Sequence, residues 1–104
     1  MKITKLQSYA FFQKLSSLPV IEKIILYGSR ARGDNQERSD IDLAIDCPQA
    51  TSKEWHHIMD IVEEADTLLG IDCVRLDTLS EKNPLRRSIL KDGILLYQRD
   101  SHDR

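Results

Sequence analysis

The stretch YGSRARGDNQERSDIDLAID, from Tyr27 to Asp46, brings a glycine–serine turn and a pair of aspartates together in one short segment. The run IEKIILY before Gly28 is rich in β-branched and aromatic residues, which predicts a buried strand. Residues 40–46 alternate between polar or small and apolar side chains, which is typical of a strand with one buried face. The stretch therefore predicts two strands joined by a short helical turn that begins at Ser29.

Two capping boxes predict where helices begin. In such a box a Ser or Thr is followed three residues later by Glu or Gln, and both satisfy free amides of the first turn. Thr4 opens one box, and the apolar stripe behind it predicts a helix that ends near Ser16. Thr51 opens the other, and its stripe predicts a longer helix that stops at Gly70.

The last third of the chain predicts two more strands and one helix. IDCVRLD, residues 71–77, and ILLYQ, residues 94–98, are expected strands. The helix between them begins after Asn83-Pro84 and stops at Gly93, and the charged residues 99–104 are expected to fray. The order helix, strand, helical turn, strand, helix, strand, helix, strand predicts an α/β (α+β) fold with one sheet and helices packed on it.

Composition and charge narrow the classes of function. At 104 residues the chain fits one compact core, so we expect a single domain over residues 1–104. A net charge of −2 disfavours direct nucleic-acid binding through a basic surface, so any phosphate site must be local. No apolar run approaches the roughly 20 residues of a membrane span, and we see no signal peptide. Cys47 and Cys73 lack ligand spacing and predict reduced thiols in a cytoplasmic protein.

The turn after the first strand has the chemistry of a phosphate site. Gly28 allows close approach of a ligand, and Ser29 adds a hydroxyl donor to the free amides of a first helical turn. Arg30 and Arg32 supply positive charge and forked donors. The alternative is a plain capped turn with solvated arginines. A Walker loop is excluded, because Asp34-Asn35 stands where Lys-Ser or Lys-Thr is required.

Asp40 and Asp42 are spaced so that their carboxylates share one face of a strand, about 6–7 Å apart along the chain. Neighbouring carboxylates repel unless a cation compensates, and this donor set suits Mg²⁺ or Mn²⁺. The alternative is the solvent-facing half of an edge strand. Asp72 adds weight to the metal interpretation, because it shares a face with Val74 and Leu76, where an unpaired carboxylate is costly.

If the strands of Asp42 and Asp72 are neighbours, three carboxylates converge near the serine turn. Such a cluster suits two-metal phosphoryl transfer, in which cations clamp a triphosphate and one carboxylate orients or deprotonates the attacking hydroxyl. Asp77, by contrast, lies among polar residues near a strand end and is predicted to be ordinary surface.

Gly28-Ser29, ten intervening residues and Asp40-Ile41-Asp42 resemble the signature of the DNA polymerase β-type nucleotidyltransferase superfamily. The segments GSRARG, SDIDLAI and IDCVRLD are most similar to its smallest members, the minimal nucleotidyltransferases or MNT domains. The resemblance covers roughly residues 24–97. It implies a polymerase β-like mixed sheet of about four strands flanked by helices.

The resemblance also implies roles for the site residues. The substrate would be ATP with Mg²⁺, two ions being expected and Mn²⁺ being an alternative, and a nucleotidyl group would be transferred with loss of pyrophosphate. The triphosphate would be held by Gly28 and Ser29, with less constrained help from Arg30 and Arg32. The three carboxylates would ligate the metals, with the last also the expected base: Asp40, Asp42 and Asp72.

MNT proteins are typically paired with a small helical HEPN-domain protein, often encoded by the adjacent gene. The resemblance therefore implies an antitoxin that adds AMP to a tyrosine of a HEPN toxin. Two alternatives stay open: a binding module that neutralises its partner by contact alone, and a transferase for a small molecule that relies on a separate substrate-binding subunit. Leu95, Tyr97 or part of the first helix could form the partner surface.

Overall fold

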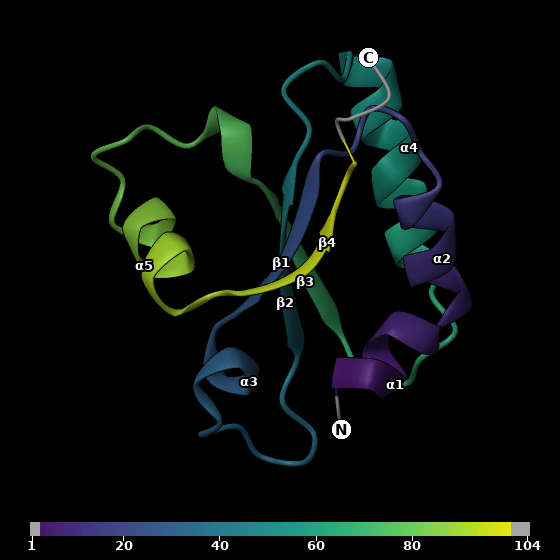
Figure 1. Cartoon of the computed structure of the whole chain (residues 1–104). Coiled ribbons are helices and arrows are strands. Elements are labelled where there is room, and N and C mark those ends of the chain that lie inside the picture. The colour runs from purple at the N-terminus through teal and green to yellow at the C-terminus, as the bar shows by residue number, and fades with distance from the viewer. Residues whose placement is uncertain (1–2, 101–104) are drawn as a thin grey trace.

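The fold is built on a mixed four-stranded sheet (Figure 1). In this computed structural model, which describes residues 3–100, the strands lie in the order β3-β2-β1-β4. Strand β1 is antiparallel to both β2 and β4, whereas β2 and β3 are parallel. The strands span Lys23–Tyr27 (β1), Ile41–Asp46 (β2), Ile71–Arg75 (β3) and Ile94–Gln98 (β4). The predicted mixed sheet with helices against it is confirmed.

Helices cover both faces of the sheet. Figure 1 shows α1, α2 and α4 on one side and α3 and α5 on the other. A 3-10 turn, Leu76–Thr78, follows β3. The helices span Ile3–Ser8 (α1), Ala10–Ser16 (α2), Ser29–Arg32 (α3), Ser52–Glu63 (α4) and Pro84–Asp92 (α5). Among residues 3–100, no helix is long and apolar enough to cross a membrane.

The alternation in β2 divides its side chains between two cores. Ile41, Leu43 and Ile45 are fully buried in the main core, under α1, α2 and α4. Ala44 belongs to a smaller core on the opposite face, together with Ile25 of β1 and residues of the α5 side. Because side chains alternate along a strand, Asp42 lies on the face of the smaller core.

The predicted first helix ends at Ser16 as expected, but it is broken at Tyr9 into two helices, so the prediction of one continuous helix is wrong. Tyr9 has extended backbone angles, φ −65° and ψ 146°, and separates α1 from α2. Phe11, Phe12 and Leu15 of α2 are all buried in the main core. Thr4 lies inside α1 instead of capping it, and the Gln7 amide donates to the Leu96 carbonyl at 2.8 Å.

The predicted capping box at Thr51 is confirmed, but helix α4 ends at Glu63 and not at Gly70. The Gly70 carbonyl accepts a hydrogen bond from the Ile41 amide at 2.8 Å, so the chain at Gly70 already belongs to the sheet edge. The Thr67 hydroxyl accepts from the Leu69 amide at 3.1 Å, which satisfies the backbone of the connecting loop without helix. Gly70 thus serves the sheet edge and not the end of the helix.

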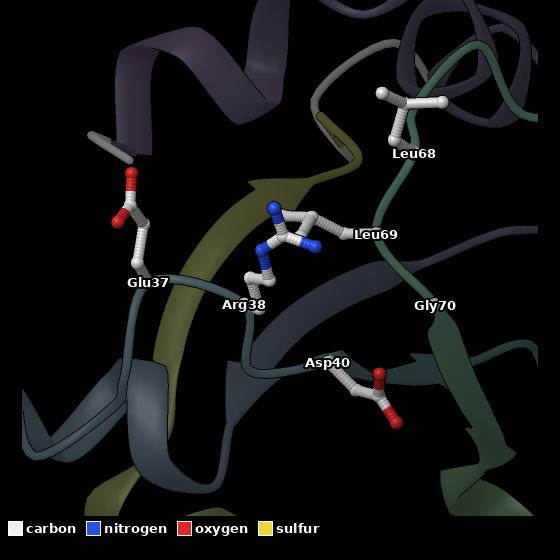
Figure 2. Close-up of a pocket in the computed structure, with 6 residues that line it drawn as sticks. All are labelled: Glu37, Arg38, Asp40, Leu68, Leu69 and Gly70. Carbon is white, nitrogen blue, oxygen red and sulfur yellow. The ribbon is translucent and has the colours of Figure 1, made fainter.

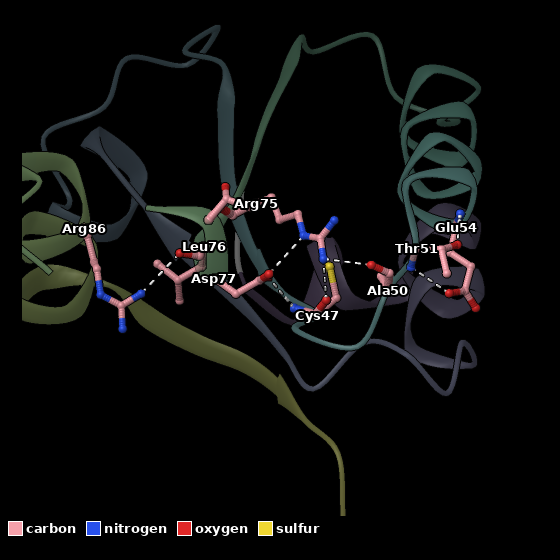
Figure 3. A network of polar contacts seen from close by, with 9 residues as sticks. Cys47, Ala50, Thr51, Glu54, Arg75, Leu76, Asp77 and Arg86 are labelled. Atoms are coloured by element: carbon pink, nitrogen blue, oxygen red, sulfur yellow. Dashed lines mark hydrogen bonds and ion pairs between the residues drawn. The ribbon is translucent and has the colours of Figure 1, made fainter. Parts of the chain in front are cut away.

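Asp77 is an internal anchor, so its prediction as ordinary surface is wrong. Its carboxylate accepts from the Cys47 amide at 3.0 Å and from Arg75 Nε at 3.0 Å (Figure 3). Arg75 also donates to the carbonyls of Cys47 and Ala50, at 3.0 and 2.9 Å. This network ties the end of β3 to the loop between β2 and α4, and its residues could not be paired from sequence alone.

The C-terminal elements follow the prediction up to the tail. Asn83 caps α5 by accepting from the Leu85 amide at 2.8 Å, and Gly93 ends the helix. The expected fraying does not begin at Arg99, whose amide donates to the Glu22 carbonyl at 2.8 Å. Residues 101–104 lie outside the described residues.

Candidate active site

A row of three polar side chains crosses three strands on the face of the smaller core. Tyr27 of β1 is paired in register with Asp42 of β2, and Asp42 is paired with Asp72 of β3. Neighbouring strands lie about 4.8 Å apart, so side chains in one row are close neighbours. Asp72 shares a face with Val74 as predicted, but its side chain is exposed, so the expected cost of an unpaired buried carboxylate does not apply to it.

Asp40 lies immediately before β2 and extends the carboxylate group towards the start of β3. Figure 2 shows its side chain directed towards the strand that begins after Gly70. A Cβ atom at Gly70 would lie 2.7 Å from Asp40 Oδ1, so any side chain there would require the Asp40 carboxylate to move. Glycine at this position therefore makes the space that the Asp40 carboxylate occupies. The sequence had indicated Gly70 only as a helix stop.

Gly28 places the serine turn directly against Asp42. Its φ of 75° and ψ of −154° lie in a region that is essentially restricted to glycine. A Cβ atom there would lie 2.4 Å from Asp42 Oδ2. The predicted phosphate turn and the predicted metal ligand, fourteen positions apart in the chain, are therefore in contact distance of each other. Ser29, half-buried, begins α3 as predicted.

Arg30 is directed away from the carboxylates and onto the loop that precedes β2. Its Nε and Nη2 donate to the Ser39 carbonyl at 3.0 and 2.7 Å, and Nη2 also donates to the Glu37 carbonyl at 3.1 Å. The structure thus places Arg30 as a clamp that holds the segment leading into Asp40. The sequence could not reveal these carbonyl partners, because they come from backbone geometry and not from side-chain type.

Arg32 lies nearer to the acidic groups and remains exposed. Its Nε forms an ion pair with Asp34 at 3.2 Å, and 46% of its side chain is accessible. Its charge acts on the aspartates, because it lowers the pKa of Asp42. Of the two predicted arginines, Arg32 is the one whose charge opposes the raised pKa of Asp42.

The site carries more negative charge than the protein itself compensates. Burial raises the pKa of Asp42, and the charges of Asp72 and Asp40 raise it further, against the opposing effect of Arg32. Burial, followed by the charges of Asp42 and Asp72, raises the pKa of Tyr27 to about 12. Repulsion of this kind is relieved by a bound cation. The row therefore has the electrostatic character of a cation site.

The donor set fits a hard divalent cation. Asp40, Asp42 and Asp72 offer carboxylate oxygens, which Mg²⁺ and Mn²⁺ prefer, and Mg²⁺ commonly binds one or two carboxylates together with substrate phosphates. Within residues 3–100 no three acidic, histidine or cysteine side chains are already close enough to form a complete metal site. The protein carboxylates would thus supply only part of a coordination shell.

Residues 11–102 match the protein family described as polymerase beta, nucleotidyltransferase. The chain belongs to this family. It is a nucleotidyltransferase, and the resemblance drawn from Gly28-Ser29 and the aspartate pair is confirmed.

A curated relative and three solved structures resemble this nucleotidyltransferase. A provisionally named protein adenylyltransferase of Methanocaldococcus jannaschii is 29% identical over 75 residues, which are 71% of this chain and 75% of the relative. A toxin–antitoxin structure with AMP-PNP has a TM-score of 0.66 at 20% identity and covers 99% of this chain and 78% of its own.

The other two structures support the same fold. An MntA–HpeT toxin–antitoxin variant with two Asp-to-Glu substitutions gives a TM-score of 0.65 at 18% identity, covering 99% of this chain and 78% of its own. A provisionally assigned Sulfolobus solfataricus nucleotidyltransferase gives 0.59 at 21% identity, covering 95% and 80%. At these identities the likeness shows the fold, which confirms the predicted polymerase β-like architecture.

Proposed function

We propose that this nucleotidyltransferase transfers AMP from ATP to a tyrosine hydroxyl of a helical HEPN-domain partner, and so acts as the antitoxin of a toxin–antitoxin pair. The observation that carries the proposal is the contact geometry of the site: Gly28 lies against Asp42, and Asp42 is in register with Asp72. The adenylyltransferase name of the Methanocaldococcus relative and the toxin–antitoxin neighbours support the choice of reaction and partner.

The reaction assigns each residue a task. The acceptor oxygen attacks the α-phosphorus of ATP, the new P–O bond forms, and the bond to the β-phosphate oxygen breaks so that pyrophosphate leaves. Asp72, the exposed end of the row, accepts the hydroxyl proton at its carboxylate. Asp40, Asp42 and Asp72 would hold Mg²⁺, which would compensate the charge of the triphosphate.

The serine turn and the arginines bind the triphosphate and position the carboxylates. Gly28 lets the triphosphate approach the backbone, and the Ser29 hydroxyl donates to a phosphate oxygen. Arg32 contributes positive charge next to Asp42. Arg30 uses Nε and Nη2 on the carbonyls of Ser39 and Glu37 and so positions the segment before Asp40, and its Nη1 would be the group that reaches a phosphate oxygen.

The first test is intact-mass spectrometry of the HEPN-type protein encoded beside this chain, after incubation with the chain, ATP and Mg²⁺. A mass gain of one or more AMP units is expected. Asp42→Asn should abolish the gain, whereas Asp60→Asn, an exposed aspartate on α4, should leave it unchanged. No gain with the wild-type chain, but a stable complex, would favour neutralisation by contact alone. Gain on a small molecule added in place of the protein would favour the third alternative.

The predicted partner surface is supported only in part. The Leu95 side chain is 50% exposed, so it remains a candidate, whereas Tyr97 packs against the main core. Of the first helix, Ile3 is 38% exposed. A contact surface at Leu95 would serve both the catalytic protein and the contact-only module.

A further inference from the structure

A cavity of about 530 Å³ lies beside Asp40. It opens where the loop before β2 faces the loop before β3 (Figure 2). Its size falls in the range of sites that hold a small molecule or a large side chain. It is lined by Glu37, Arg38, Asp40, Leu68, Leu69 and Gly70.

The sheet order determines the side from which an acceptor can approach. The Gly28-Ser29 turn follows β1, on one side of β2, and Asp72 lies on β3, on the other side. In phosphoryl transfer the attacking and leaving oxygens lie in line on opposite sides of the phosphorus. A triphosphate held at the serine turn directs pyrophosphate to the β1 side. The attacking oxygen must therefore come from the β3 side, where the cavity opens.

The cavity presents an apolar wall next to the carboxylates. The Leu68 side chain is fully exposed, and Leu69 beside it packs partly against the main core. Serine and threonine have too little apolar surface to cover a leucine and also reach a carboxylate. Tyrosine combines a large apolar ring with a terminal hydroxyl, and so can contact Leu68 while its oxygen extends past Asp40 towards Asp72, the proposed base.

The opposite wall carries a positioned cation. Arg30 holds the carbonyls of Glu37 and Ser39, the two neighbours of Arg38 in the chain. The backbone that carries Arg38 is therefore fastened, and the exposed Arg38 guanidinium offers several donors at the cavity. Backbone carbonyls or acidic side chains of an extended polypeptide would bind to such a group.

We propose that this cavity receives the acceptor segment of the partner protein, with the tyrosine ring against Leu68 and the flanking backbone at Arg38. The inference rests on the proposed function and specifies the place at which the partner chain binds. The nucleoside of ATP is the competing occupant, and the test distinguishes the two.

Leu68→Ser is the diagnostic variant, and Leu90→Ser is its matched control. Both leucines are exposed, Leu90 by 58% on α5, so both variants should fold. With the adjacent-gene HEPN-type protein as acceptor, Leu68→Ser should raise KM for that protein about tenfold or more, as loss of one apolar side-chain contact predicts. Its affinity for ATP with Mg²⁺, measured by calorimetry, should not change. Leu90→Ser should match the wild type in both measurements.

A second experiment measures where the partner protein binds and does not depend on transfer activity. A benzophenone amino acid introduced at position 68 should crosslink to the partner peptide that contains the modified tyrosine, whereas the same group at position 90 should not. Wild-type kinetics for Leu68→Ser, weaker ATP binding, or a crosslink to a peptide remote from the modified residue would each overturn the cavity assignment while leaving AMP transfer established. Absence of AMP transfer by the wild-type chain would instead overturn the proposed function, and this inference with it.

Discussion

Substitution of Gly28 by alanine should damage both the fold and the active site. The backbone at Gly28, φ 75° and ψ −154°, costs a residue with a side chain about 1–3 kcal/mol. The added Cβ would also lie 2.4 Å from Asp42 Oδ2, whereas ordinary contact begins at 3.4 Å, so the carboxylate must move by about 1 Å. Misplacement of this size can reduce a rate about 100-fold, so we expect such a decrease in kcat/KM for AMP transfer.

Gly33→Ala is the control that separates backbone strain from the clash. Gly33 also has a positive φ, 84°, but a Cβ atom there would meet nothing within 4 Å. Urea unfolding should show a loss of about 1 kcal/mol for Gly33→Ala, with transfer activity retained. If both variants lose activity equally, or if Gly28→Ala transfers AMP at the wild-type rate, the contact between the serine turn and Asp42 does not control catalysis.

Three further predictions concern charged groups. Since folding raises the pKa of Asp42, the ionised Asp42 carboxylate destabilises the folded protein at pH values above the normal carboxyl pKa. Asp42→Asn should therefore have a higher melting temperature than the wild type at pH 7, with a smaller difference at pH 4, while transfer is abolished. A melting temperature below that of the wild type at pH 7 would contradict this sign. Arg75→Met removes one partner of a mostly buried ion pair and should lower the free energy of unfolding by about 3 kcal/mol, whereas Arg32→Met at an exposed pair should cost less than about 1 kcal/mol in the same urea titration. Arg30→Met should accelerate proteolysis within residues 33–40, because it releases two carbonyls, and unchanged cleavage would show that the clamp is dispensable.

Local signals predicted well wherever neighbouring residues determine the outcome. The capping box at Thr51 and the cap at Asn83 formed as expected, because each is completed within three residues. The alternation of β2 correctly placed Ile41, Leu43 and Ile45 on one face and Asp42 and Ala44 on the other, although this second face is also covered, by the smaller core. Where partners lie far apart in the chain, the same signals failed: Gly70, predicted as a helix stop, instead pairs with Ile41 at the edge of the sheet, and α4 ends at Glu63.

The candidate site shows the same division between local and distant determinants. The spacing of Gly28-Ser29 and the aspartate pair by itself identified the nucleotidyltransferase family. Only the tertiary structure decided that Arg30 binds backbone carbonyls, that Asp77 is an internal anchor and that a cavity opens beside Asp40. Residue type and spacing show which chemical groups a segment can offer. Which of these groups form hydrogen bonds or ion pairs with one another depends on strand order and register, and those are established only when the whole chain packs.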